Sequence, residues 1–293
     1  MKQFFALTAA PLLAFTLLAS DADAQQFSKR KQYNTVGVSL NAMNYFGDIT
    51  PKPSIPSFRA GATRPNIGLM LSHRFTPRIS ARASLSYGRI TGEDSKAADQ
   101  NDRDAKFRYN RNMNFRNDIL ELAAVGTFDL VENRNNYIKR PDFVPYLFGG
   151  VGVIHHNPKG ENKSGDIVAL QPLRTEGQDK TYGLTQFVIP FGAGARYKLN
   201  RNFDVGLELG FRKTFTDYLD DVSGNYVDKR ESLGSDDAKY FGWDITREFA
   251  GTYTKAQQGG EMRGKSNEKD WYTTLGISVN YILAPKVRNP KFR

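Results

Sequence analysis

The sequence contains no cysteine and only three histidines in 293 residues. Without cysteine there is no disulfide framework, no thiol nucleophile and no thiolate metal ligand. Beyond the first two dozen residues, no stretch reaches the roughly 18 consecutive apolar residues of a membrane-spanning helix, which argues against a helical membrane protein. What the chain does have is basic character, with a formal net charge of +10.

The first residues have the composition of an export signal. Lys2 precedes an apolar run over 4–18, and small residues at 22–24 offer a cleavage site. The apolar run is too short and wrongly flanked for a membrane anchor. We therefore expect residues 1–24 to be a secretory signal peptide, cleaved before Gln25. Export argues against nucleic acid as the partner of this basic chain.

Eight segments alternate apolar with polar residues, most clearly over 202–212, where every second residue from Phe203 to Phe211 is apolar. Each segment is long enough to cross hydrocarbon as a tilted strand, which needs roughly 9–11 residues. Because lipid satisfies no backbone hydrogen bonds, such strands must close on themselves. The segments are 33–44, 65–75, 79–90, 114–130, 144–155, 186–199, 202–212 and 271–283.

This pattern predicts an all-β fold, an eight-stranded antiparallel transmembrane up-and-down β-barrel over 25–283, followed by a basic tail over 284–293. A soluble β-sandwich or an exported lipocalin-like barrel would instead point the apolar residues inward. Charged residues on one face of five strands argue against that alternative, because so small an interior could not solvate them.

The face opposite the apolar residues predicts a charged lumen. An eight-stranded barrel is only wide enough for side chains to fill it, so opposite charges there should pair. A plug of ion pairs is the simpler interpretation, and a conducting pore is the alternative. The charged residues on this face are Arg74, Arg82, Glu121, Asp129, Arg196, Asp204, Glu208 and Arg212.

The connections between the segments run long, short, long, short. Outer-membrane barrels have short periplasmic turns and long external loops. This predicts an integral protein of the outer membrane with both termini in the periplasm. The long connections are 45–63, 91–111, 157–183 and 215–270, and the short ones are 76–78, 131–143 and 200–201.

The short turns and the tail form a basic rim. A one-sided basic rim can steer and orient an acidic partner. Alternatively, these residues are soluble edges, or they hold anionic headgroups of the inner leaflet. The residues proposed to bind a partner are Arg134, Lys139, Arg140, Arg78, Arg201, Lys286, Arg288 and Lys291.

Two further groups of residues could form sites. Asp217, Asp220, Asp221 and Asp228 could gather oxygen ligands around Ca²⁺, but their spacing matches no known calcium loop, and a folded loop cap is the simpler interpretation. The adjacent pair at 155–156 makes a poor metal or catalytic site, because neighbouring strand residues point to opposite faces. We expect no enzyme activity, no cofactor and no small-molecule substrate.

Four strings, NYFGDITP, NMNFRNDILELAAVGTFDL, RPDFVPYLFGGVGVIHHNPKG and TFTDYLDDVSGNYVD, together resemble the PorG family, small outer-membrane barrels of the type IX secretion machinery of Bacteroidetes-type bacteria. The resemblance implies a non-enzymatic component that sits with a periplasmic ring of a lipoprotein and its partner, supporting protein export and, in some species, gliding. It carries over no catalytic residues. A free-standing surface barrel of the adhesin or stress-response kind has the same architecture and is the alternative.

Overall fold

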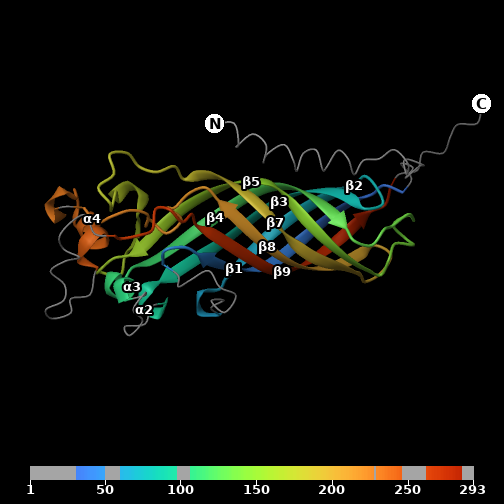
Figure 1. Ribbon diagram of the computed structural model, residues 1–293. Coiled ribbons are helices and arrows are strands. Elements are labelled where there is room, and N and C mark those ends of the chain that lie inside the picture. The colour runs from blue at the N-terminus through green and yellow to red at the C-terminus, as the bar shows by residue number, and fades with distance from the viewer. Residues whose placement is uncertain (1–30, 50–59, 98–105, 228, 246–261, 286–293) are drawn as a thin grey trace, which may run out of the picture.

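The computed structural model describes residues 31–49, 60–97, 106–227, 229–245 and 262–285. Eight long antiparallel strands form a closed barrel in which neighbours in sequence are neighbours in space (Figure 1). Pairing of β1 with β9 and of β4 with β5 completes the ring, which confirms the predicted fold class. The strands are β1 (Asn34–Phe46), β2 (Arg64–Arg74), β3 (Ile79–Glu93), β4 (Asn114–Asp129), β5 (Phe143–Glu161), β7 (Thr185–Lys198), β8 (Phe203–Thr214) and β9 (Trp271–Leu283).

The long loops add short elements at one end of the barrel (left in Figure 1). A short strand, β6 (Ile167–Ala169), pairs with the long-loop end of β5. The helical elements are η3 (Ala60–Ala62), α2 (Asp94–Ala97), α3 (Lys106–Arg111), η4 (Gln171–Leu173), η5 (Arg230–Ser232), α4 (Asp236–Lys239) and η6 (Tyr240–Asp244). No helix of the described residues is long and apolar enough to cross a membrane. The predicted signal peptide lies outside the described residues.

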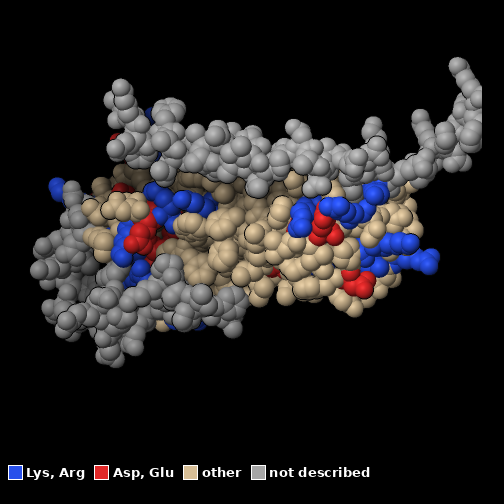
Figure 2. Space-filling view, turned by 45° about the vertical axis from the view of Figure 1, so that its right-hand side comes forward, with Lys and Arg blue, Asp and Glu red and all other residues tan. Residues whose placement is uncertain are grey.

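The exterior of the barrel is apolar. Val151 and Phe187 are 65% and 70% exposed on β5 and β7, and Leu122 is 60% exposed on β4. On β4 the apolar belt runs from Phe128 to Leu120, roughly 27 Å along the strand at about 3.4 Å per residue. Figure 2 shows the corresponding uncharged surface between two charged ends. So large an exposed apolar surface would be costly in water, and it is the exterior of a transmembrane barrel.

Two strands run three or more residues further than the alternation predicted. We expected β3 to end at Ile90 and β5 at His155, but they continue to Glu93 and Glu161. Beyond the apolar belt the outward-facing residues become polar while the inward-facing ones stay buried. The prediction followed apolar outward residues, so it stopped where the strands leave the hydrocarbon. The facing of β5, ambiguous in the sequence, is clear in the structure, where Tyr146 and Phe148 are buried on the inward face.

The predicted lumen charges all form ion pairs. Arg82 makes a two-point contact with Glu208, at 2.6 and 3.1 Å. Asp129 accepts from Arg74 at 2.8 Å and also from Arg196. Arg212 lies 3.3 Å from Glu121. The remaining charge, Asp204, pairs with Arg140, a residue that was not predicted to enter the barrel.

These side chains close the lumen. Cavities of about 20, 30 and 40 Å³ lie among these side chains, and a cavity this small holds one or a few water molecules. Phe148 and Tyr146 fill further space, and glycines on the neighbouring strands make room for them: a Cβ on Gly194 would lie 2.6 Å from the Tyr146 ring. The interior is therefore a plug of ion pairs and aromatic rings.

Candidate functional site

The two ends of the barrel differ in construction. At the long-loop end, the described parts of all four long loops fold together into a cap with its own apolar core. Residues from the strand ends, such as Met43 and Tyr272, pack there with loop residues such as Leu219 and Phe241, all of them almost fully buried. A smaller apolar cluster in the last loop surrounds Trp243. The cap is thus a folded part of the protein rather than a set of independent loops.

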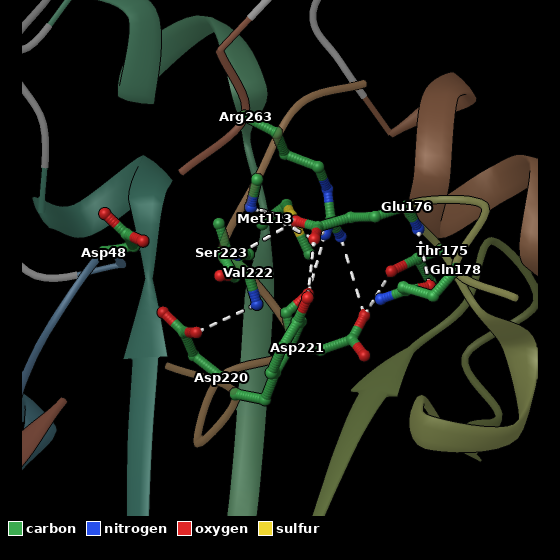
Figure 3. A network of polar contacts seen from close by, with 12 residues as sticks. Asp48, Met113, Thr175, Glu176, Gln178, Asp220, Asp221, Val222, Ser223 and Arg263 are labelled. Atoms are coloured by element: carbon green, nitrogen blue, oxygen red, sulfur yellow. Dashed lines mark hydrogen bonds and ion pairs between the residues drawn. The ribbon is translucent and has the colours of Figure 1, made fainter. Parts of the chain in front are cut away.

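Arg263 is the centre of a buried polar network in this cap (Figure 3). Its Nη1 donates to Glu176 Oε1 at 2.8 Å and to the Asp221 carbonyl at 2.7 Å. Glu176 in turn accepts from the backbone N–H groups of Ser223 and Gly224. Arg263 is fully buried, so its charge depends on these acceptors. The network fastens the loop after β5 to the loop after β8.

Arg111 connects the other two loops, those after β1 and β3, to the cap in a similar way. It makes a two-point contact with Asp94, at 2.8 and 2.9 Å, and donates to the carbonyl oxygens of Asp48 and Arg263. The Asp48 carboxylate accepts from the backbone N–H of Lys265 at 3.0 and 3.1 Å. Arg111 is 1% exposed and Asp94 is fully buried. All four loops are therefore held by buried, charge-assisted hydrogen bonds.

Tyr45 bridges two buried carboxyl groups. Its hydroxyl lies 2.7 Å from Asp220 Oδ2 and 2.6 Å from Asp270 Oδ1. The hydroxyl has one proton to donate, so the second short contact needs a proton from a carboxyl group. Burial, followed by repulsion from nearby carboxylates, raises the pKa of both Asp220 and Asp270 well above the usual value. Asp220 accepts two backbone N–H groups and Asp270 only one, which makes Asp270 the easier of the two to protonate.

The aspartates of the acidic loop after β8 accept hydrogen bonds from other residues of the cap. Asp217 accepts from Ser223 Oγ at 2.6 Å, and Asp221 accepts from the hydroxyls of Thr175 and Tyr182. Burial raises the pKa of Asp217 to about 6 and that of Asp221 to about 6, although Arg263 acts against the shift at Asp221. No group of three or more metal-ligating side chains is found among the described residues. These described aspartates are hydrogen-bonded within the folded cap, as the folded-cap interpretation expects, and Asp228 lies outside the described residues.

A cavity of about 860 Å³ opens beside the cap, at the long-loop ends of β3, β4 and β5. Its lining mixes polar and apolar side chains, and Asn114, Arg116, Lys159, Glu161 and Asn162 are among the polar ones. No pattern in the sequence predicted this cavity.

The short-turn end carries the predicted partner-binding residues. Arg134, Lys139 and Arg201 are exposed, and Arg134 pairs with Glu132 at 2.9 Å. Arg78 is half-buried and donates to the Leu130 carbonyl at 2.7 Å. Lys286, Arg288 and Lys291 lie outside the described residues.

For Arg140 the prediction of a partner-binding role is wrong. Its side chain is only 4% exposed and donates to Asp204 inside the barrel end, so it cannot contact a partner. The 131–143 turn folds back over the barrel mouth, which turns a predicted surface residue into a structural one. No local signal in the sequence distinguishes Arg140 from Lys139.

The histidines are separated, as strand alternation predicted. His155 is exposed on the outer wall, whereas His156 is fully buried beside Asn117. His73 contacts Asn34 at the other end of the barrel. Neither a pair nor a cluster of histidines forms in the described structure.

A protein family described as "Domain of unknown function (DUF6089)" matches residues 22–260. The chain belongs to this family. A comparison with curated proteins gave no match. The family description names no activity.

Similar solved structures are small outer-membrane barrels. They include the attachment invasion locus protein Ail of Yersinia pestis (9% identity, 86% of this chain and 99% of that one, TM-score 0.41). Neisserial surface protein A (9%, 85% and 96%, 0.39) and a major outer membrane protein of Thermus thermophilus (10%, 85% and 99%, 0.38) are others. Similarity this low supports no conclusion about function.

Proposed function

We propose that this protein is a non-enzymatic integral barrel of the outer membrane that docks a periplasmic ring of a type IX protein secretion machine. The apolar exterior contacts lipid and the lumen is filled, so the two ends are the surfaces left for partners. The long-loop end faces outward and the short-turn end, with both termini, faces the periplasm. The resemblance of the four strings to the PorG family supports the choice of machine.

The observation that carries the docking role is the set of exposed cations on the short turns. Arg134, Lys139 and Arg201 project at one end of a rigid barrel, and the turns that hold them are fixed by Arg140, which donates to the carbonyls of Tyr137, Asn200 and Arg201. Cations on a preorganised surface favour an acidic partner and increase its rate of association. The partner would be an acidic face of the ring lipoprotein or of its companion.

A free-standing surface barrel of the adhesin or stress-response kind is the second candidate. The folded cap and its adjoining cavity favour it, because they give the long-loop end a defined surface. The two candidates differ in which end of the barrel has a partner.

Affinity isolation of the tagged protein from gently solubilised outer membranes tests the proposal. The variant Arg134→Glu/Lys139→Glu/Arg201→Glu reverses three exposed cations on the short turns. Lys163→Glu/Lys180→Glu/Lys229→Glu makes the same change in charge at exposed positions of the long loops and is the matched control. We expect wild type and control to retain a stoichiometric periplasmic lipoprotein, and the short-turn variant to retain at least about fivefold less.

Recovery of the wild-type barrel alone, across several mild detergents at low salt, would contradict the docking role and favour the surface barrel. Equal recovery with both variants would remove the electrostatic part of the proposal. Heat-modifiable migration on gels checks that every variant is folded.

A further inference from the structure

The outer wall of the barrel carries cations directly above the apolar belt. On β3, the exposed apolar residues Leu85 and Tyr87 are followed on the same face by Arg89. On β4, Leu120 is followed on the same face by Asp118 and then Arg116. These positions lie where the strands leave the hydrocarbon, at the depth of lipid headgroups.

Strand register brings these residues into two adjacent rows. Arg89 is paired with Asp118 across β3 and β4. One step further out, Arg116 is paired with Thr91 on one side and with Lys159 of β5 on the other. Paired residues in antiparallel strands have Cβ atoms about 4.5–5.5 Å apart. Three cations and one carboxylate therefore share a small area of the outer wall.

The charges in this area do not balance. Asp118 accepts from Arg89 Nε at 2.5 Å and lies 3.8 Å from Lys159 Nζ, so one carboxylate serves two cations. Arg116 Nε is buried and contacts no acceptor among the described residues. Arg89 and Lys159 have side chains 40% and 30% exposed. The two rows therefore have a surplus of positive charge. Of the two carboxylates one step further out, Glu93 pairs with Lys96 at 2.6 Å and Glu161 is exposed at the edge of the cavity.

The cavity of about 860 Å³ continues from these rows toward the cap. Arg116, Lys159 and Thr91 line it, and beyond them lie Asn162 and Tyr240. Amide and carboxylate side chains with an aromatic ring suit a polar, ring-shaped group rich in hydroxyls. A headgroup that combines a phosphate with a sugar would fit the cation rows and the cavity together (Figure 2 shows charged side chains of both signs gathered at this end).

We propose that the outer wall of β3, β4 and β5 binds a phosphorylated glycolipid of the surrounding leaflet. The phosphate lies against Arg89, Arg116 and Lys159, because guanidinium groups bind phosphate oxygens in a two-point geometry. The sugar enters the cavity, and the acyl chains follow the apolar belt below. This inference rests on the proposed insertion, with the long loops on the outer side, and is independent of the secretion role.

Native mass spectrometry of the purified full-length barrel in detergent tests the proposal. The probes are bisphosphorylated lipid A, its dephosphorylated form and phosphatidylglycerol. The variant Arg89→Gln/Arg116→Gln/Lys159→Gln removes the cations, and Lys163→Gln/Lys180→Gln/Lys229→Gln is the matched control. We expect wild type and control to bind the bisphosphorylated lipid, and the variant to bind it about tenfold more weakly or worse.

Equal binding by variant and wild type would overturn the site. Equal binding of the dephosphorylated form would overturn the role of the phosphate, and equal binding of phosphatidylglycerol would overturn the role of the sugar. A barrel that fails to insert into lipid vesicles would instead contradict the membrane placement itself. Loss of the secretion role leaves this measurement unchanged, since it uses only the barrel and lipid.

Discussion

Arg140 reaches from the turn between β4 and β5 into the mouth of the barrel, where its Nε and Nη2 donate to Asp204 Oδ1 at 2.9 and 2.6 Å. The same guanidinium donates to four backbone carbonyls of the two turns around it. One side chain thus closes the short-turn end and fixes the turns that carry the exposed cations.

Removing Arg140 should therefore destabilise the barrel. Arg140→Ala leaves Asp204 buried without a counter-charge, and breaking such a pair costs about 3–5 kcal/mol. Urea unfolding of the reconstituted barrel measures the change in unfolding free energy. Arg134→Ala, which removes a neighbouring exposed arginine, should change it by less than about 0.5 kcal/mol. Equal effects of the two substitutions would contradict the structural role of Arg140.

The filled lumen predicts that the barrel conducts no steady ionic current in a planar bilayer. Replacing Arg82, Glu208, Glu121 and Arg212 together by serine removes both members of each pair, so no charge is left unpaired. Arg140 with Asp204 and the folded cap still close the two ends of this variant, so we expect it to stay closed as well. A stable open channel in the wild type would contradict the plug.

The buried carboxyl groups predict that the cap is less stable at pH 8 than at pH 5. Burial raises the pKa of Asp217 and that of Asp221 to about 6. It also raises the pKa of Asp220 and that of Asp270 well above the usual value for an aspartate. The folded state therefore holds protons that an unfolded Asp, with a pKa of about 3.9, releases. These protons stabilise the cap fully at a pH below the unfolded pKa of about 3.9. As the pH rises through the folded pKa values, the unfolding free energy of the cap falls by on the order of 2 kcal/mol.

Trp243 reports on this change, because it is buried in the cap, and Trp271→Phe removes the other tryptophan of the chain. Urea titrations at the two pH values should show an earlier transition at pH 8. Asp270→Asn should reduce the difference, since its amide can donate to Tyr45 and accept from Leu219. Asp220→Asn should destabilise the cap at both pH values, because its amide would face a backbone N–H group. The opposite order would contradict the assignment of the proton to Asp270.

Arg263 should stabilise the cap and not the barrel. Arg263→Met leaves Glu176 and Asp221 buried without their cation, at a cost of about 3–5 kcal/mol to the cap. Trp243 fluorescence should then show the cap unfolding at lower urea, while heat-modifiable migration of the barrel is retained. Concerted loss of barrel and cap would show that the two are one cooperative unit.

The barrel could be predicted from the sequence because each strand is specified by a pattern of neighbouring residues. A period of two identifies each strand and its outward face, and loop length gives the order of connections. The lumen pairs followed from the same alternation, because a narrow interior forces residues such as Arg82 and Glu208 together although they are far apart in the chain.

The cap could not be predicted in the same way. Asp48 contacts Lys265, 217 residues away, and Arg111 contacts Arg263, 152 residues away. No periodicity marks such contacts, since each depends on how two irregular loops fold against each other. The acidic residues of the last loop were visible in the sequence, but their partners are scattered over several loops. Arg140 was misplaced for the same reason.

The most direct test of the docking role is photo-crosslinking in living cells, with a photoreactive amino acid placed singly at Lys139, Arg201, Lys163 or Lys180. These exposed positions sample the short turns and the long loops in turn. The account predicts a covalent adduct with a periplasmic ring component from Lys139 and Arg201, and none from the other two. Adducts formed only from Lys163 and Lys180, or an absence of adducts at the short turns, would contradict it.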